Sequence, residues 1–471
     1  MKTYTIHTHS ISTLADLLTP VGVYSTLRDR FPNALLLESA DYHSRAESKS
    51  FICLEPMAGF SATGTNYQLQ LQGESGEAHT VSNPREIWAA FSRFLELFEA
   101  APSNQGPGGC GLFGYTAFEA VNYVEDLQLS HPRSDAKDNP DLHYHLYRYV
   151  LVFDHFKNEL HLTENCLEVT TETSEGLQRL LELLPIHHPS GFGFQPKGEE
   201  QSSISDAAYR EYVEKGIAHC QRGDVFQVVL SREFQQAFTG DDFLVYRSLR
   251  SINPSPYLFY FDYGDFRIFG SSPESQLQLH EGTATIHPIA GTVLRGADTA
   301  EDEARARALQ NDPKEKAEHV MLVDLARNDL SKHAEKVAVE TYAEIQQFSH
   351  VMHMVSKVSG SNLPPKSGLT VFADTFPAGT LSGAPKYRAL QIIDACETSN
   401  RNFYGGAIGF FGFDGSVNHA IIIRSILSKN NVLTYQAGAG IVVASSPEGE
   451  LQEVNNKVAA LRRAIAKAAT L

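Results

Sequence analysis

The chain has 471 residues, 42% of them hydrophobic, and a formal net charge of -17 at pH 7. This length is enough for two or three domains or for one large two-part enzyme. The acidic balance disfavours nucleic acid and anionic membranes as partners, and no apolar run approaches the roughly 18 residues of a membrane span. The five cysteines are widely spaced without a Cys-x-x-Cys pair, and the N-terminus has no apolar signal core. We therefore predict reduced thiols and a cytoplasmic protein.

The first part of the chain alternates between short apolar runs and turn-rich stretches. Residues 34–37 and 149–153 are predicted strands, and residues 84–101 have the apolar spacing of a helix. Residues 106–114 are predicted to form a glycine-rich turn region. Proline, glycine and serine crowd residues 185–203 without periodicity, which is typical of a linker.

After this linker the pattern becomes denser. Residues 206–221 read as a helix that stops at Gly223, and residues 226–234 read as a strand. Further strands are predicted at residues 257–261, 283–287, 406–413, 419–427 and 434–437. Helices and strands mix without a regular βαβ repeat, so the predicted class is α+β, with large mostly antiparallel sheets flanked by helices. We expect two closely packed parts, an N-terminal region of residues 1–190 and a catalytic domain of residues 200–471.

A predicted helix begins at Asp312, a good N-cap, followed by Pro313 at the first helical position. At about 100° per residue, Glu315 and Glu318 lie along the apolar stripe of this helix. Glu315 alone could complete a capping box. Two carboxylates on a core face cost several kcal/mol unless a cation compensates, which favours a metal or a catalytic role for the pair.

A second predicted helix repeats this arrangement near the C-terminus. Ser446 and Pro447 begin it, and Glu450 and Glu453 lie beside its apolar stripe. If the two helices face each other, four carboxylates converge, and an all-oxygen ligand set suits Mg²⁺ or Mn²⁺ better than zinc. Lys457 either grips a substrate carboxylate or neutralises Glu453 four residues earlier.

Three glycine-rich segments, expected to be turns, accompany these helices at residues 290–292, 379–383 and 436–440. The middle one is not a phosphate loop, because two residues separate its last glycine from Lys386. Exposed backbone N–H groups can also hold a carboxylate. Together with Arg424, expected on a strand, and with Lys386, the three segments predict a site for a small polyanion.

Long ordered motifs carry a resemblance to a known family. They lie at residues 288–296, 318–330, 379–386, 404–410 and 436–440. In these motifs the chain resembles the chorismate-utilising enzymes, which include the large subunits of anthranilate and aminodeoxychorismate synthases and the isochorismate and salicylate synthases. The resemblance covers residues 205–467 and implies the fold of that family.

Two positions distinguish the branches of this family. Aminodeoxychorismate synthases typically have a nucleophilic lysine where this chain has Ala290. The water-using members have a lysine base where this chain has Gln227, and an amide cannot take a proton from water usefully at neutral pH. The resemblance therefore implies direct attack by ammonia, giving anthranilate and pyruvate from chorismate. Two rivals stay open: an aminodeoxychorismate synthase that uses another route, and a non-catalytic tryptophan-binding regulator.

The resemblance also implies roles for individual residues. Glu274 would protonate the departing ring hydroxyl. Tyr404 and Arg424 would hold the enolpyruvyl carboxylate. His353 would aid pyruvate elimination, Thr292 would steer ammonia, and Gln227 belongs to the catalytic group. The remaining substrate-binding residues implied are Gly291, Thr380, Gly438, Ala439, Gly440 and Lys457. Mg²⁺ is the implied cofactor, bound directly by Glu315 and Glu450 and through water by Glu318 and Glu453.

The N-terminal part resembles the tryptophan feedback region of the ammonia-using branch. The implied inhibitor pocket consists of Glu38, Ser39, Lys49, Pro256, Tyr257 and Leu258. Because free NH₃ is scarce at neutral pH, the family takes it from a separate glutamine amidotransferase subunit. We therefore expect a hetero-oligomer with such a partner.

Overall fold

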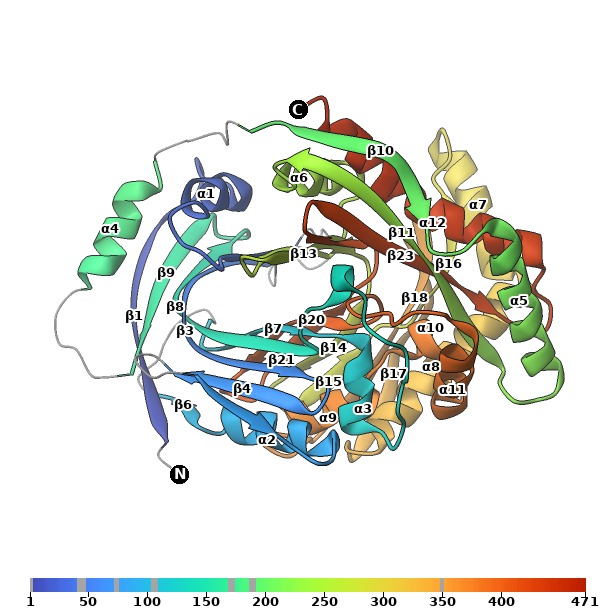
Figure 1. Cartoon of the computed structure of the whole chain (residues 1–471), viewed down its shortest axis with the longest axis horizontal. Helices are drawn as coiled ribbons and strands as arrows, with labels where there is room; N and C mark the ends of the chain where they lie inside the picture. The colour runs from blue at the N-terminus through green and yellow to red at the C-terminus, as the bar shows by residue number, and fades with distance from the viewer. Residues whose placement is uncertain are drawn as a thin grey trace.

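The computed structural model describes residues 3–39, 48–71, 76–102, 109–167, 174–185, 192–347 and 351–471. Two large sheets share a pair of long antiparallel strands, β3 (Lys49–Thr63) and β8 (Leu142–Asp154), as Figure 1 shows. One half of each long strand belongs to the first sheet and the other half to the second. The chain therefore folds around two joined sheets rather than two separate ones.

The first sheet runs in the order β1, β9, β8, β3, β2, β12, β13, β22, β23, β11, β10. Every pairing in this sequence of strands is antiparallel. Its remaining strands are β1 (Tyr4–Leu14), β9 (Glu159–Cys166), β2 (Leu35–Glu38), β12 (Tyr257–Asp262), β13 (Phe266–Ser272), β22 (Ser425–Lys429), β23 (Val432–Ile441), β11 (Gln227–Gly240) and β10 (Phe194–Ser202).

The second sheet runs in the order β5, β4, β3, β8, β7, β20, β21, β14, β15, β18, β17, and β16 lies beside β15 on the same edge of β18. Its own strands are β5 (Glu77–Thr80), β4 (Asn66–Leu71), β7 (Gly111–Thr116), β20 (Ala407–Gly412), β21 (Val417–Ile421), β14 (Ser275–His280), β15 (Thr283–Ile286), β18 (Val351–Ser361), β17 (Lys336–Gln347) and β16 (Ile289–Leu294). Short β6 (Phe98–Ala100) pairs parallel with β1, and β19 (Gly383–Ala384) pairs with β11.

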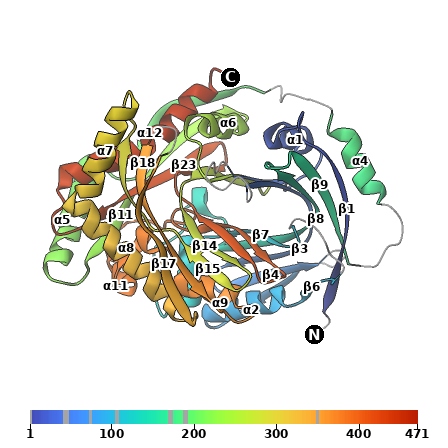
Figure 2. The same ribbon diagram turned by 180° about the vertical axis from the view of Figure 1, so that it is seen from behind.

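Helices cover the outer faces of both sheets. In Figure 1, α5, α6 and α12 lie over β11 and β23, and Figure 2 shows α7 and α8 in front of β17 and β18. The helices are α1 (Pro20–Leu27), α2 (Arg85–Leu95), α3 (Val121–Val124), α4 (Glu175–Leu183), α5 (Asp206–Gln221), α6 (Phe243–Ile252), α7 (Thr299–Asn311), α8 (Pro313–Ser331), α9 (Gly368–Thr375), α10 (Gly379–Ser382), α11 (Lys386–Cys396) and α12 (Pro447–Ala468). The α+β class expected from the sequence is confirmed.

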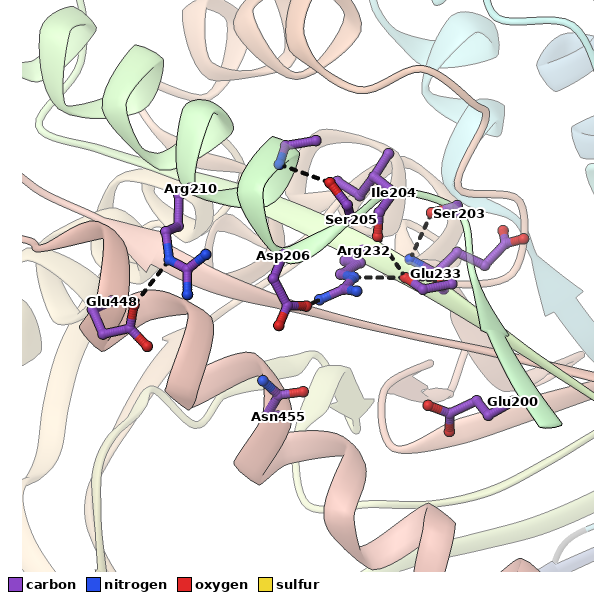
Figure 3. A network of polar contacts seen from close by, with 12 residues as sticks. Glu200, Ser203, Ile204, Ser205, Asp206, Arg210, Arg232, Glu233, Glu448 and Asn455 are labelled. Atoms are coloured by element: carbon purple, nitrogen blue, oxygen red, sulfur yellow. Dashed lines mark hydrogen bonds and ion pairs between the residues drawn. The ribbon is translucent and has the colours of Figure 1, made fainter.

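A polar network fixes the first turn of α12 against α5. Figure 3 shows Arg210 of α5 directed at Glu448 of α12, with Arg210 Nε 2.8 Å from Glu448 Oε2. In the same view Arg232 of β11 contacts Asp206 at the start of α5. These contacts link α5 to the first turn of α12 and to β11.

Several predicted boundaries in the N-terminal part are wrong. The helix expected over residues 84–101 ends at Leu95, because the chain then extends into β6 beside β1. Part of the expected glycine-rich turn, residues 103–108, lies outside the described residues. The last residues of this segment begin strand β7 instead. Gly111 and Gly114 allow the neighbouring strands to approach closely, since a Cβ on Gly114 would lie 2.0 Å from His143 O.

The expected linker and two later segments also differ from prediction. Residues 194–202 of the linker form β10, which hydrogen-bonds to β11, while residues 186–191 lie outside the described residues. The strand expected over residues 419–427 is interrupted at Arg424, whose φ of 50° turns the chain between β21 and β22. The segment at residues 436–440, expected to be a turn, is part of strand β23. Glycine is found within strands where another group approaches the backbone closely.

The five cysteines, all within the described residues, form no disulfide with one another. Among the helices that the structure describes, none combines the length and apolar character that a membrane crossing requires.

Candidate active site

Both acidic helices begin where their caps predict. Asp312 Oδ1 accepts hydrogen bonds from the backbone N–H groups of Lys314 at 2.8 Å and Glu315 at 3.1 Å. Ser446 Oγ accepts one from Gly449 N at 3.2 Å. Glu315 does not complete a capping box, because its carboxylate lies against β16: a Cβ on Gly291 would be 3.0 Å from Glu315 Oε2.

The two helices bring their four glutamates close enough to interact. Burial raises the pKa of Glu318, and the charges of Glu315 and Glu453 raise it further. Burial likewise raises the pKa values of Glu315 and Glu450, with Glu453 adding to both. Across the described residues, no three His, Cys, Asp or Glu side chains are close enough to ligate one metal ion. The acids therefore form a loose anionic cluster, and a cation that entered it would lower their mutual repulsion.

Lys457 contacts both this cluster and β23. Its Nζ lies 2.8 Å from Glu453 Oε1 and donates to Gly438 O at 2.8 Å. The neutralising role that the sequence left open is present. The side chain is still 44% exposed, so substrate can reach it.

Glu274 lies between β13 and β14 and is buried, with 9% of its surface exposed. Burial raises its pKa to about 7, against the opposing effects of Thr380, Lys457 and Arg424. A cavity of about 40 Å³ adjoins Glu274 and Thr380 and is walled on one side by Leu322 of α8. A carboxyl group with this pKa retains its proton in a large fraction of molecules at neutral pH, as a general acid requires.

Arg424 provides a positive charge beside this acid. Burial lowers its pKa, and Glu274 is the acid that opposes this effect. Among the described residues, its guanidinium has one hydrogen bond, from Nη1 to Asn253 Oδ1 at 3.4 Å. This fork can therefore take a carboxylate.

Tyr404 is buried beside β23, where a Cβ on Gly438 would lie 3.2 Å from the tyrosine hydroxyl oxygen. The backbone of Gly438 lowers the pKa of Tyr404 by a hydrogen bond, although burial raises that pKa overall. The N–H of Gly438 thus points away from β11, and Gly440, two residues later, points the same way. Ala439 between them pairs with Leu230 and is fully buried. The two glycine N–H groups and Tyr404 can form one edge of an anion site.

His353 is held against β16 by Gly291. A bulge in β16 gives Gly291 a φ of 65° and places its carbonyl 2.9 Å from His353 Nδ1. A carbonyl only accepts, so Nδ1 carries the proton and Nε2 is the basic nitrogen. Burial lowers the pKa of His353 to about 4, which makes the imidazole neutral at pH 7. Thr292 pairs with His353 through its backbone, and its side chain is outside the described part of the structure.

Gln227 begins β11 and faces Glu318. Its Nε2 donates to Glu318 Oε1 at 3.3 Å, and only 3% of the residue is exposed. A Cβ on Gly440 would lie 2.3 Å from Gln227 Nε2, so glycine at this position is what makes room for the amide.

Lys386 does not join the site as predicted. Its Nζ is buried, donates to Thr375 O at 2.9 Å and pairs with Asp329 at 3.3 Å. Its charge therefore stabilises the junction of α8, α9 and α11 rather than binding an anion.

Sequence reasoning missed Arg401, the largest fully buried side chain among those described. Its guanidinium donates to Leu381 O in α10 and Val229 O in β11, each at 2.7 Å, and forks onto Glu397. Arg401 thereby joins the segments that carry Thr380 and Gln227. The only signal in the sequence is the spacing of four between Glu397 and Arg401, which is typical of a surface pair.

The predicted inhibitor residues also come together, at the ends of three neighbouring strands. Leu258 of β12 pairs with Glu38 of β2, and Leu37 pairs with Phe51, two residues from Lys49 in β3. Ser39, Pro256 and Tyr257 adjoin these positions in the chain. The carboxylate of Glu38 already has partners within the protein. Both its oxygens accept hydrogen bonds from Arg250 at 2.9 Å, and one also accepts a hydrogen bond from Tyr246 at 2.5 Å.

Comparisons with known proteins agree with this geometry. A family model described as chorismate binding enzyme matches residues 35–463. The chain belongs to this family of chorismate-binding enzymes.

The more specific likeness is to one member of the family. The chain is 37% identical over 463 residues to the anthranilate synthase component 1 of Neisseria meningitidis serogroup A, covering 96% of this chain and 93% of the relative. It is 38% identical over 496 residues to that of Geobacillus stearothermophilus, covering 97% and 93%. The crystal structure of anthranilate synthase component I from Streptococcus pneumoniae matches with a TM-score of 0.77 and 32% identity, covering 96% of this chain and 99% of that one. The Escherichia coli isochorismate synthase MenF shares the fold, with a TM-score of 0.74 at 19% identity.

Proposed function

We propose that this chain is the synthase subunit of an anthranilate synthase, which converts chorismate and ammonia to anthranilate and pyruvate. The observation that carries the proposal is the pairing of a protonatable buried acid, Glu274, with a carboxylate-binding fork, Arg424, in a site that has no lysine nucleophile or base at Ala290 or Gln227. The near full-length relatives named anthranilate synthase component 1 support it.

The residues fit the proposed chemistry in the following way. Arg424, Tyr404 and the N–H groups of Gly438 and Gly440 would bind the enolpyruvyl carboxylate. Glu274 would protonate the departing ring hydroxyl so that it leaves as water. The neutral imidazole of His353 can then accept a proton as pyruvate is eliminated.

The acidic cluster fits Mg²⁺, which we propose as the cofactor. The four carboxylates on α8 and α12 are hard oxygen donors. Burial and neighbouring carboxylates raise the pKa values of Glu315, Glu318 and Glu450, so a divalent cation would relieve unfavourable charge. Glu315, Glu318, Glu450 and Glu453 would hold it. When bound, the ion would act as a Lewis acid on the ring carboxylate.

Two further parts of the proposal rest on the relatives. The designation component 1 supports a second subunit, which we propose is a glutamine amidotransferase that delivers ammonia. The convergence of β2, β3 and β12 supports tryptophan as a feedback inhibitor bound beside Glu38 and Leu258, in a place distinct from the chorismate residues.

Turnover of chorismate by the purified chain, with ammonium and Mg²⁺, tests the proposal. Anthranilate is followed by its fluorescence and pyruvate by a lactate dehydrogenase assay, and equal amounts of both are expected. An aminated product without pyruvate would instead indicate an aminodeoxychorismate synthase. Tryptophan binding without turnover would indicate a regulator.

A further inference from the structure

The cavity beside Glu274 also reaches a second acid. Glu274 and Thr380 line one part of it, and Asp329 of α8 lines another. Apolar side chains of the same helix, Ala326 among them, form part of its wall. Of the residues that the structure describes, Glu274 and Thr380 are the only ones that this cavity shares with the proposed chorismate site. The general acid therefore adjoins a space that lies outside the proposed carboxylate cradle.

This cavity is suited to hold water. Its volume of about 40 Å³ exceeds the roughly 10–15 Å³ that one water molecule needs. Two of its lining residues, Ser275 and Gln276, each have a buried oxygen with no hydrogen-bond partner among the described residues. Gln276 Nε2 donates to Thr375 O at 3.1 Å, which fixes the amide and leaves Oε1 as the unpaired atom. Buried polar oxygens of this kind are usually satisfied by ordered water, because an unpaired one is costly.

At Asp329 the cavity meets a buried ion pair. Asp329 Oδ2 and Lys386 Nζ are 3.3 Å apart, and only 8% and 11% of these side chains are exposed. Burial raises the pKa of Asp329 and lowers the pKa of Lys386, which brings the two values closer together and eases proton exchange within the pair. The charges of Lys332, Asp374 and Glu125 also act on the pair. Asp374 is 43% exposed, so the pair lies close to solvent.

Glu274 needs a proton donor once it has acted. In the proposed reaction it gives its proton to the departing ring hydroxyl and is left as a carboxylate, at a residue that is only 9% exposed. Thr380, Lys457 and Arg424 act on this carboxyl group, and all three favour its ionised form. They therefore oppose the return of the proton, and bulk water reaches the group poorly.

We propose that water in this cavity carries a proton from Asp329 to Glu274 after each turnover, and that Lys386 resupplies Asp329. This inference rests on the function proposed above and adds a proton relay to it. Asp329 acts through water and does not touch the substrate, so it is a positioning and relay residue rather than a catalytic one.

The proton transfers balance without a further reagent. As the C–N bond forms, the ring C–O bond breaks with its electron pair on oxygen, and this oxygen takes the proton of Glu274 and leaves as water. A cavity water then protonates Glu274, Asp329 protonates that water, and solvent restores the proton through Lys386. The ammonium group formed on the ring releases one proton to solvent, so the cycle consumes none.

Asp329→Asn tests the relay, because an amide keeps the shape of the carboxyl group but does not relay a proton. At about pH 6 most resting molecules already have a protonated Glu274, whose pKa is about 7, so a first turnover needs no relay. With enzyme in excess over chorismate, the single-turnover rate constant should stay within about twofold of that of the unaltered protein. The steady-state kcat should fall by at least about tenfold, because each later turnover waits for a proton.

Ala326→Val is the second variant, since it fills the cavity with two methyl groups and leaves every polar side chain in place. The same separation of the two rates is expected, which keeps the test valid if Asp329→Asn does not fold. Asp324→Asn is the matched control on the same helix, at a side chain that is 65% exposed, and should change neither rate.

Two results would overturn the relay. Equal falls in the single-turnover rate constant and kcat would show that Asp329 only supports the fold around Glu274. An unchanged kcat in the folded variants would show that Glu274 recovers its proton by another route. Absence of anthranilate formation by the unaltered chain would instead reject the proposed function itself.

Discussion

The substitution Glu274→Gln removes the proposed acid while leaving a side chain of the same shape at the same buried position. Glutamine keeps the shape of the side chain and removes its titration, at a site that is 9% exposed and whose pKa is raised from 4.5 to about 7 by burial. Loss of a general acid predicts that kcat for anthranilate formation falls by about 10² to 10⁴. The same substitution should also change how stability depends on pH.

The size of that change follows from the pKa. Between about pH 4.5 and pH 7 the folded protein retains a proton on Glu274 that the unfolded chain has lost, so folding stability falls as pH rises. At 1.36 kcal/mol per pKa unit, the interval from 4.5 to about 7 corresponds to about 3.4 kcal/mol. About 0.8 kcal/mol of this stability is already lost at pH 5, so about 2.5 kcal/mol is lost between pH 5 and pH 8.

Urea unfolding of both proteins at pH 5 and pH 8 measures this quantity. Other titrating groups are common to both and cancel in the difference, so the variant should gain about 2.5 kcal/mol relative to the unaltered protein at the higher pH. Glu281→Gln, at a side chain that is 87% exposed, is the matched control and should leave the pH dependence near that of the unaltered protein. A difference that stays constant to within about 0.5 kcal/mol would refute the argument that burial protonates Glu274.

Three further outcomes are expected. Glu315→Gln should reduce Mg²⁺-dependent turnover by at least about tenfold while calorimetry still detects tryptophan binding; unchanged activity would count against the acidic cluster as the cation site. Lys49→Ala should raise the inhibition constant for tryptophan by about tenfold, with the KM for chorismate unchanged; retained inhibition would remove Lys49 from the pocket. Arg401→Lys loses the fork onto Glu397 and at least one carbonyl contact, and should lower the free energy of unfolding by about 3 kcal/mol; urea denaturation showing a loss below about 1 kcal/mol would contradict that role.

Local chemistry explains which parts of the fold could be predicted. The cap at Asp312 and the helix over residues 206–221 were located correctly, because side-chain capping and apolar periodicity act within a few residues. Residues 194–202 were predicted to belong to a linker because proline, glycine and serine crowd residues 185–203 without periodicity, and only pairing with β11 makes them a strand. Pairing with a distant strand leaves no period in the sequence itself.

The site shows the same division. The two acidic helices could be recognised from spacing. Their mutual approach could not, because α8 packs on β16, β17 and β18 of the second sheet and α12 packs on β23 of the first. The opposite outcome holds for Lys386, which looked like an anion ligand but is neutralised by Asp329, 57 residues earlier in the chain. Arg401 was invisible for a related reason: a buried guanidinium is stable only when fixed carbonyls and a carboxylate satisfy it, and these partners come from three separate elements.

The contacts of Asn253 show how the proposed inhibitor and substrate sites can influence each other. Asn253 lies three residues before Pro256, and its Oδ1 accepts from Arg424 Nη1 at 3.4 Å. Ser271 N also donates to Arg424 O at 3.2 Å, and Ser271 Oγ contacts Asn253 O. A ligand that moved residues 253–258 would therefore alter the support of the guanidinium that we propose binds chorismate. Because coupling between binding sites is reciprocal, chorismate should weaken tryptophan binding by the same factor, and Asn253→Ala should reduce both effects together.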